Sequence, residues 1–368
     1  MTLLRLEVSS SRGSYPVWIG PGASEQVGEL VRSATTGGRV ALISDSNVAP
    51  LHGQAVLEAL RHADVDVTMH TFEAGEPSKI RRHWSRLTDE ILETGMGRDG
   101  SVVALGGGVT TDLAGFVAAT YMRGVPVVHV ATSSLAMIDA AIGGKTGVDV
   151  RAGKNLVGAF HPPVGVIADT EHLSTLAPVP MAEGLVEALK HGAIRDAGHF
   201  EAVGAGASAL LEGDRSDAAA LVAASVSIKA AVVSDDEFEG GYREILNFGH
   251  TIGHAIETET SFAVGHGTAV AAGMRVEARI GEILGVTEAG TRASIEAATR
   301  PLGLPPVPAL DADDVLRHVG VDKKARAGRP RYVLLERIGA TATDGGFART
   351  VPDAVVREAL VAELAHPL

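Results

Sequence analysis

Short runs of β-branched residues alternate with segments of helical periodicity over the first 176 residues, and this alternation limits the fold more than any other feature. Strands are predicted at residues 3–8, 17–20, 39–44, 66–72, 101–105, 125–130 and 164–168, with helices between several of them at 23–32, 53–62 and 79–94. Strand, helix and strand at this spacing are typical of a largely parallel sheet covered by helices. We therefore predict an α/β N-terminal domain over residues 1–176.

The pattern changes beyond residue 176. From residue 181 to 303 the sequence is rich in Ala, Glu, Leu and Val at helical spacing, and a short strand (331–335) and a last helix (353–365) follow. Such a segment predicts helices packed on helices. We expect an all-α C-terminal domain over residues 177–368, and the division agrees with ordinary domain sizes.

Charge and cysteine content exclude several classes of function. The chain carries 32 Lys and Arg against 45 Asp and Glu, a net charge of −13 that argues against general nucleic-acid binding. Without cysteine, any metal must be held by histidine, carboxylate or water. The start of the chain lacks the basic flank and apolar stretch of a signal peptide, and no run suggests a membrane span. We expect a cytoplasmic protein that does not bind membranes.

A glycine run follows one predicted strand and precedes a helix. In the segment 101–112, SVVALGGGVTTD, three glycines allow backbone N–H groups to approach a phosphate, and the helix start favours its negative charge. A plain tight turn would look similar, but three consecutive glycines favour a nucleotide-binding sheet. Asp45 ends an apolar strand and is placed to accept a hydrogen bond from a ribose hydroxyl, while GEPSK at 75–79 opens a helix.

A second glycine-rich run spans IGGKTGV (142–148) and GKN (153–155). Its end resembles a P-loop, but Asp139 occupies the place of the first glycine, so the spacing excludes that motif. What remains is Lys145, Lys154 and Asn155 on glycine-rich backbone, which suits an anionic ligand or an ordinary surface loop.

The helical half contains two histidines four residues apart. His250 and His254 in NFGHTIGH share one helix face, and His266 follows between two glycines. Upstream, EALK places Glu187 three residues before Lys190. Each could be a core histidine or a solvated ion pair, but the combination favours a metal site. Spacing nominates both His250 and His254 as ligands and does not choose between them.

Basic and polar residues flank these histidines. If they converge on the metal, they form a pocket for a polyanionic substrate, and otherwise they are surface charge. The residues are Lys229, Arg243, Asn247, Lys323 and Lys324.

The ordered set of motifs resembles the 3-dehydroquinate synthase family of sugar phosphate cyclases. The matching strings, from about residue 45 to 335, are GGGVTTDLAGFVAATYMRG, DAAIGGKTG, GKNLVGAFHPP, EALKHG, REILNFGHTIGHAIE and HGTAVAAGM. The resemblance implies that 3-deoxy-D-arabino-heptulosonate 7-phosphate is converted to 3-dehydroquinate and phosphate, with transient oxidation by NAD. It also implies a divalent metal, zinc or cobalt.

The resemblance assigns roles residue by residue. It implies that Glu187, His250 and His266 hold the metal, so that His254 faces the substrate. The residues it places around NAD, with their neighbours in the same motifs, are Asp45, Asn47, Gly75, Glu76, Lys79, Gly107, Gly108, Val109, Asp112, Thr132, Ser133, Lys145 and Lys154. Those it places around the substrate are Asp139, Lys145, Asn155, Lys190, Lys229, Glu239, Arg243, Asn247, His254 and one of Lys323 or Lys324. Arg123 matches a position that reaches the neighbouring subunit, which implies a homodimer.

Three positions depart from the family pattern. Thr111 replaces a glycine, Ala131-Thr-Ser133 replaces Pro-Thr-Thr, and Thr268 replaces the glutamate two residues after His266. The first two adjoin the expected NAD site and the third adjoins a metal ligand.

Related functions remain as alternatives. Cyclases that make 2-epi-5-epi-valiolone, 2-deoxy-scyllo-inosose or amino-dehydroquinate share the motifs, and a metal-dependent polyol dehydrogenase resembles the architecture. The first two act on sugars without a carboxylate, so Arg243 together with Lys229 favours the acid substrate. A dehydrogenase would have no use for so many phosphate-binding lysines, and a non-catalytic relative would be expected to have lost some of these residues.

Overall fold

The chain folds into two compact units. The computed structural model describes residues 3–35, 38–151, 153–325 and 329–365, with 321–325 as backbone alone. One unit comprises Met1–Ala177 and Arg215–Ser234, and the other comprises Pro178–Asp214 and Asp235–Leu368. The first unit therefore includes a returning segment that the sequence analysis placed in the helical half, because helical periodicity does not show which core a helix packs against.

The first unit is built on a seven-stranded sheet in the order β1-β2-β9-β6-β5-β3-β4. All neighbouring pairs are parallel except β1 with β2. The strands are β1 (Leu4–Ser10), β2 (Gly13–Ile19), β3 (Val40–Asp45), β4 (Val67–Phe72), β5 (Ser101–Gly106), β6 (Val127–Ala131) and β9 (Gly165–Ala168). The predicted α/β class with a mostly parallel sheet is confirmed.

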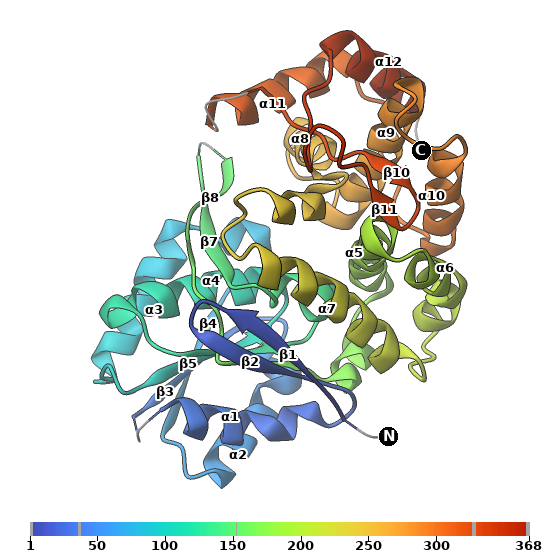
Figure 1. Cartoon of the computed structure of the whole chain (residues 1–368). Helices are drawn as coiled ribbons and strands as arrows, with labels where there is room; N and C mark the ends of the chain where they lie inside the picture. The colour runs from blue at the N-terminus through green and yellow to red at the C-terminus, as the bar shows by residue number, and fades with distance from the viewer. Residues whose placement is uncertain (1–2, 36–37, 152, 326–328, 366–368) are drawn as a thin grey trace. The chain divides into compact units, whose positions relative to one another are not determined.

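Helices cover both faces of this sheet, and the pleat divides its side chains between two cores (Figure 1). Ala41 and Ile43 of β3 pack in the core with α3 (Arg81–Glu93) and α4 (Gly108–Thr120). Val40 and Leu42 pack in the opposite core with α1 (Val27–Ala34) and α2 (Gln54–His62). Burial on both faces explains why the central strands read as continuous apolar runs rather than as alternating patterns.

The order of the strands creates a natural ligand position. From β3 the chain crosses to β4 on one side, and β5 then returns to pair with β3 on the other. In open parallel sheets, ligands bind beyond the carboxyl ends of the strands where the order reverses in this way. Asp45 ends β3 and Gly106 ends β5, so both lie at this point.

The second glycine-rich run forms a β-hairpin, for which the sequence analysis predicted no strands. Lys145 begins β7 (Lys145–Val150), and Lys154 and Asn155 lie on β8 (Gly153–Phe160), which pairs antiparallel with β7. No strand was predicted over these residues, because Gly, Asp, Lys and Asn are poor strand formers. Gly143 and Gly144, both at positive φ, supply the turn that leads into β7.

Helix α7 (Ala218–Asp235) ends the first unit's returning segment. Among the described helices it is the one whose length and apolar composition would suffice to cross a membrane, although the core helix of a soluble protein passes the same test. Lys229, in its middle, donates to the backbone carbonyl of Asp139 at 2.6 Å. A polar contact of this kind marks α7 as a packed helix of the unit.

The second unit is almost entirely helical. Its core joins residues of α8, α9, α11 and α12. The helices are α5 (Pro178–Arg195), α6 (Ala197–Leu211), α8 (His250–Glu259), α9 (His266–Ile283), α10 (Thr291–Thr299), α11 (Ala312–Ala325) and α12 (Asp353–Leu364). A two-stranded ribbon of β10 (Leu335–Arg337) and β11 (Ala340–Thr341) is added. The strand predicted at 331–335 is therefore displaced toward the C-terminus, with one isolated bridge between Tyr332 and Arg349.

The buried His129 of β6 should make the first unit sensitive to acid. Burial, with a smaller contribution from neighbouring His161, lowers the pKa of His129 to about 3. Between pH ~6.5 and pH ~3 the unfolded chain binds a proton at this residue that the folded chain does not. Each unit by which the pH is lowered in this range therefore reduces the free energy of unfolding by about 1.4 kcal/mol. Above pH ~6.5 the effect vanishes.

We expect His129→Leu to reduce the pH dependence of urea unfolding between pH 6 and 5 by about that slope. The control is a substitution of His62, which is exposed on α2. Equal slopes for wild type and His129→Leu would contradict the assignment.

Candidate active site

Three side chains of the second unit meet around a buried carboxylate. Glu187 of α5 is fully buried, and its Oε1 lies 3.7 Å from Nε2 of His250 and 3.5 Å from Nε2 of His266. Lys190, one helical turn further along α5, pairs with the other oxygen, Oε2. One atom from each of Glu187, His250 and His266 lies within 4.8 Å of the others, as a shared ion requires. The carboxylate therefore has one oxygen toward the lysine and one toward the imidazoles.

A close crossing of α8 and α9 brings the two histidines together. Gly249 precedes α8 at a φ of 79°, which a side chain would strain. A Cβ on Gly273 of α9 would lie 2.0 Å from the carbonyl oxygen of Gly249, so only glycine allows this approach. The buried Glu277 of α9 accepts a hydrogen bond from the Gly249 backbone N–H at 2.8 Å. His250 begins α8 and His266 begins α9, so the crossing fixes their separation.

The donor set and its field fit a divalent cation. Ligands about 2.1 Å from a tetrahedral zinc lie about 3.4 Å from one another, close to the distances from Glu187 Oε1 to the two imidazoles. Burial lowers the pKa of His266, but Glu187 and Glu257 outweigh it and raise the pKa to about 10, so this position favours positive charge. Burial and Lys190 lower the pKa of His250 to about 3, which keeps its lone pair available.

His254 lies beside this group. Its ring centroid is 5.4 Å from that of His250 and 6.2 Å from that of His266. His254 is exposed, whereas Glu187 is not. The spacing argument nominated His250 and His254 equally, and in the structure it is Nε2 of His250 that approaches Glu187.

A 3-10 helix before α8, Tyr242–Asn247, together with the loop that leads into it, presents Arg243 and Asn247. The carboxylate of Asp236 accepts hydrogen bonds from the backbone N–H groups of Gly240, Gly241 and Arg243. Burial raises the pKa of Asp236, but these bonds outweigh it and lower the pKa overall. Arg243 is almost fully buried and donates to the Glu237 carbonyl at 2.5 Å. This hydrogen bond helps to compensate the Arg243 guanidinium for the hydration that it loses on burial.

Glu239 orients the amide of Asn247. Its Oε1 accepts a hydrogen bond from Asn247 Nδ2 at 3.0 Å. Glu239 has a φ of 59°, and Arg123 and Asn155 also have left-handed backbones, at 71° and 56°. Such conformations cost about 1–3 kcal/mol each and cluster at functional sites. Three of the residues nominated from the sequence share this property.

In the first unit, the glycine run begins α4 at the reversal point of the sheet. Gly107 is the N-cap and provides no side-chain cap, so the first N–H groups of α4 are available to an anion. Asp45 Oδ2 accepts a hydrogen bond from Thr110 of α4 at 3.0 Å, and its Oδ1 accepts from the backbone N–H groups of Asn47 and Val48. The two predicted parts of a dinucleotide site are thus adjacent.

Residues 132 and 133 lie beside the same turn. The backbone N–H of Thr132 donates to the carbonyl of Gly106, and a Cβ on Gly107 would lie 3.2 Å from Ser133 Oγ. Thr111, one of the three departures, is buried and donates to the Gly108 carbonyl at 3.0 Å. The structure therefore accommodates this departure with a local hydrogen bond.

Lys79 is the centre of a buried cluster of charges. Its Nζ lies 3.1 Å from Asp112, 3.3 Å from Glu76 and 3.9 Å from Asp149. Burial lowers its pKa, but Asp112, Glu76 and Asp149 outweigh burial and raise the pKa overall. Burial raises the pKa of Asp112, with Lys79 opposing. Lys154 reaches the same Glu76 oxygen at 3.2 Å.

Replacing Lys79 should therefore destabilise the protein strongly. Lys79→Met leaves Glu76, Asp112 and Asp149 without their shared cation, and removing one partner of a buried ion pair costs about 3–5 kcal/mol. We expect that loss in the free energy of unfolding by urea. Lys154→Met, at a more exposed position, should cost less than about 1 kcal/mol. Equal losses for the two variants would show that burial does not set the cost.

Three further nominated residues of the first unit, Lys229, Asp139 and Arg123, lie at two separate places. Lys229 Nζ lies 2.8 Å from the Asp139 carboxylate, which joins α7 to the segment before β7. Arg123 ends a short 3-10 helix, Tyr121–Arg123, and its side chain is exposed. The side chains of Lys323 and Lys324, on α11, lie outside the described residues.

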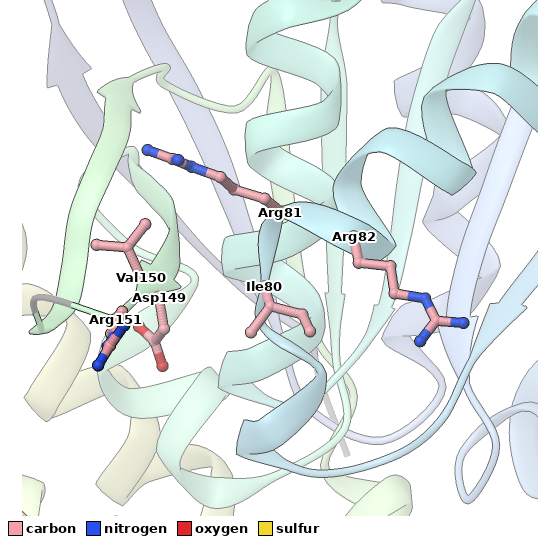
Figure 2. A pocket seen from close by; sticks show the side chains of 6 residues that line it. All are labelled: Ile80, Arg81, Arg82, Asp149, Val150 and Arg151. Atoms are coloured by element: carbon pink, nitrogen blue, oxygen red, sulfur yellow. The ribbon is translucent and has the colours of Figure 1, made fainter.

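A cavity of about 350 Å³ lies beside the Lys79 cluster. Its lining residues are Ile80, Arg81, Arg82, Asp149, Val150 and Arg151. Figure 2 shows that the side chains of Arg81 and Arg82 extend in opposite directions from the start of α3. The arginines therefore do not converge on one anion, and Asp149 is the residue that connects the cavity with Lys79.

Three residues of these groups were missed by sequence reasoning. Asp149 faces Lys79, Asp236 organises the loop of Arg243, and Glu257 lies 3.5 Å from Nδ1 of His266. A signal was available for Glu257, because it follows a histidine by seven residues, two helical turns, and so shares its face. No spacing indicates the other two, since their partners are distant in sequence or arranged by a loop.

Comparison with known proteins identifies the family. The family model described as 3-dehydroquinate synthase N-terminal matches residues 69–183, and that described as 3-dehydroquinate synthase C-terminal matches residues 184–325. A 3-dehydroquinate synthase of Xanthomonas axonopodis pv. citri is 43% identical over 95% of both chains. One from Symbiobacterium thermophilum is 43% identical over 88% of this chain and 92% of its own.

Solved structures agree with this result. A 2-deoxy-scyllo-inosose synthase complexed with carbaglucose-6-phosphate, NAD+ and Co2+ has a TM-score of 0.89 and 25% identity, covering 98% of this chain and all of its own. A 2-epi-5-epi-valiolone synthase of Streptomyces hygroscopicus subsp. jinggangensis, with NAD+ and Zn2+ bound, has a TM-score of 0.85 and 27% identity over 95% and 96%. A butanol dehydrogenase of Thermotoga maritima, at 17% identity, shares the fold alone. The chain belongs to the 3-dehydroquinate synthase family.

Proposed function

We propose that this chain is a 3-dehydroquinate synthase that converts 3-deoxy-D-arabino-heptulosonate 7-phosphate to 3-dehydroquinate and inorganic phosphate. The observation that supports it most is the convergence of Glu187, His250 and His266, with a buried Arg243 in the same unit. Asp45 and the Gly107–Gly108 turn, which are nominated for NAD, lie at the sheet reversal point of the other unit. Curated relatives of that name match nearly the whole chain.

Two bound groups would supply the chemistry that amino acids lack. Glu187, His250 and His266 would hold a divalent metal, which would supply Lewis acidity toward a substrate hydroxyl, and the N-terminus of α4 would hold NAD, which would supply reversible hydride transfer. The protein's own residues bind and orient. Arg243 is placed to pair with the substrate carboxylate, because a planar guanidinium can donate hydrogen bonds to both carboxylate oxygens at once. Lys190 holds Glu187 in place through an ion pair with its Oε2.

Proton and phosphate handling falls to residues near the metal group. Asn247, oriented by Glu239, and the exposed His254 are assigned to the substrate phosphate. In the β-elimination this phosphate takes the proton from the carbon next to the one that it leaves. Lys145, Lys229, Asp139 and Asn155, in the other unit, are assigned to the same substrate, as is one of Lys323 or Lys324. Holding the open chain in place favours the final aldol closure.

A panel of sugar phosphates tests the proposal. Purified, zinc-loaded protein with catalytic NAD should release phosphate from the heptulosonate 7-phosphate. Sedoheptulose 7-phosphate and glucose 6-phosphate, which lack the carboxylate, should be poor substrates. Phosphate release from either of these, and not from the acid, would assign the chain to a neighbouring cyclase activity.

We also propose that the protein is a soluble, cytoplasmic homodimer in which Arg123 contributes to the partner's substrate phosphate. Arg123 is exposed, which a side chain that reaches a neighbouring subunit requires. Light scattering should give twice the monomer mass. Mixing inactive Arg123→Ala and Lys190→Ala chains should restore part of the activity, because one mixed dimer site is then intact.

A further inference from the structure

The two histidines of the metal group each have a hydrogen-bond acceptor beside the ring nitrogen that faces away from Glu187. Each directs Nε2 toward Glu187 Oε1, at 3.7 Å for His250 and 3.5 Å for His266. Each directs Nδ1 toward an acceptor on the other side. For His250 it is the Phe248 carbonyl at 3.2 Å, and for His266 it is Oε2 of Glu257 at 3.5 Å. An acceptor at Nδ1 favours the tautomer with the proton on Nδ1 and the lone pair on Nε2.

Glu257 is placed for this role by its position in α8. It follows His250 by seven residues, two turns of the same helix, and only 2% of it is exposed. A carboxylate at such depth is retained where a donor or a positive charge compensates for lost hydration. Because α8 crosses α9 at Gly249 and Gly273, the start of α9 and its His266 lie against this face of α8.

We propose that Glu257 is a positioning residue of the metal centre, which fixes the tautomer and orientation of His266 and strengthens its bond to the metal. The inference rests on the proposed metal site, and it goes beyond the roles implied by the resemblance, which gave Glu257 none. The two backing acceptors differ in charge. His250 has a neutral carbonyl behind it, so His266 should be the more basic and more tightly bound ligand of the pair.

A second arrangement of the same residues makes a different prediction. His254, Glu257 and His266 also place one atom each within 4.8 Å of the others, so Glu257 could itself be a metal ligand. A ligand carboxylate replaced by an amide loses its metal bond. A positioning carboxylate replaced by glutamine keeps an oxygen acceptor for Nδ1–H and loses only the charge. Comparison of glutamine with leucine at residue 257 therefore separates the two roles.

The experiment measures metal binding on the full chain without substrate. The zinc dissociation constant is obtained by chelator competition for wild type, Glu257→Gln and Glu257→Leu, and the visible spectrum is recorded with cobalt. We expect the dissociation constant to rise about 100-fold for leucine and about tenfold for glutamine, the range found for partners of metal-bound histidines. The cobalt spectrum should shift for leucine and be largely restored by glutamine.

The matched control comes from the same helix. Glu259, two residues further along α8, pairs with Nε2 of His318 at 2.9 Å, which is also a glutamate–histidine contact. Glu259→Gln should leave the dissociation constant and the cobalt spectrum unchanged. If Glu257→Leu lowers thermal stability of the metal-free protein but leaves zinc affinity as in wild type, Glu257 is merely structural and the proposal is overturned. If the leucine variant does not fold, unchanged affinity and cobalt spectrum in Glu257→Gln overturn it equally.

The result is independent of the catalytic assignment. A chain that binds zinc with this dependence on Glu257 but forms no product would refute the proposed function alone. A chain that forms product while Glu257→Gln and Glu257→Leu bind zinc as wild type does would refute the positioning role alone. Equal loss of affinity in both variants would identify Glu257 as a ligand and overturn the positioning role.

Discussion

Glu187→Gln should abolish stoichiometric metal binding and lower turnover by at least about 10³-fold. The carboxylate faces two imidazoles at 3.5 and 3.7 Å, and an amide offers them neither its charge nor the same affinity for a cation. A metal that polarises a substrate oxygen contributes several kcal/mol to catalysis, and each ~1.4 kcal/mol is tenfold in rate. The measurement is metal content after dialysis together with phosphate release. His266→Ala should behave in the same way.

The control for this prediction is a histidine elsewhere in the second unit. His318 pairs with Glu259 at 2.9 Å and belongs to none of the candidate metal groups among the described residues. His318→Ala should retain full metal content and nearly full turnover. Retention of one ion per chain in both Glu187→Gln and His266→Ala would show that the ligand assignment is wrong.

Arg243→Lys should raise KM for the acid substrate about 10- to 100-fold with a smaller effect on kcat. Arg243 is buried and held by a backbone loop around Asp236, so its fork is fixed in direction. A lysine keeps the charge and loses the two-point contact, and a hydrogen bond to a charged group contributes about 1.5–3 kcal/mol. Steady-state kinetics separate the two constants.

A neighbouring guanidinium provides the comparison. Arg331 is exposed and pairs at 2.7 Å with Glu244, the residue that follows Arg243 in the sequence. This is an ordinary ion pair at the surface. Arg331→Lys should leave KM unchanged within about twofold, as surface pairs contribute little. An unchanged KM in Arg243→Lys would remove the argument that this chain selects a carboxylated sugar.

The fold of the first unit was predictable because its signals are local. Central strands such as β3 are continuous apolar runs bounded by polar turns, and Asp45 and the glycine run fall at strand ends by position alone. The hairpin of β7 and β8 was not predictable, because its residues pair through backbone and have low strand propensity. The sequence did not predict that α7 belongs to the first unit, because helical periodicity does not indicate which other elements a helix packs against.

In the candidate site, too, local features were predictable from the sequence and contacts between distant residues were not. Helical spacing predicted that His250 and His254 share a face, but their two roles depend on α5, which lies more than fifty residues earlier in the chain. The resemblance chose His250 as a ligand, and the structure places its Nε2 toward Glu187. The ligand roles remain predictions until metal is measured. Lys79 was nominated as a cofactor contact, whereas its partner Asp149 became visible only through the folded hairpin.

The central claim is tested most directly by identifying the product made with limiting NAD. Zinc-loaded protein is incubated with the ¹³C-labelled heptulosonate 7-phosphate and far less NAD than substrate, and the products are followed by NMR. We predict 3-dehydroquinate and phosphate in equal amounts, many turnovers per NAD, and no net accumulation of NADH. An oxidised product that forms in step with NADH, with the phosphate still attached, would contradict the account.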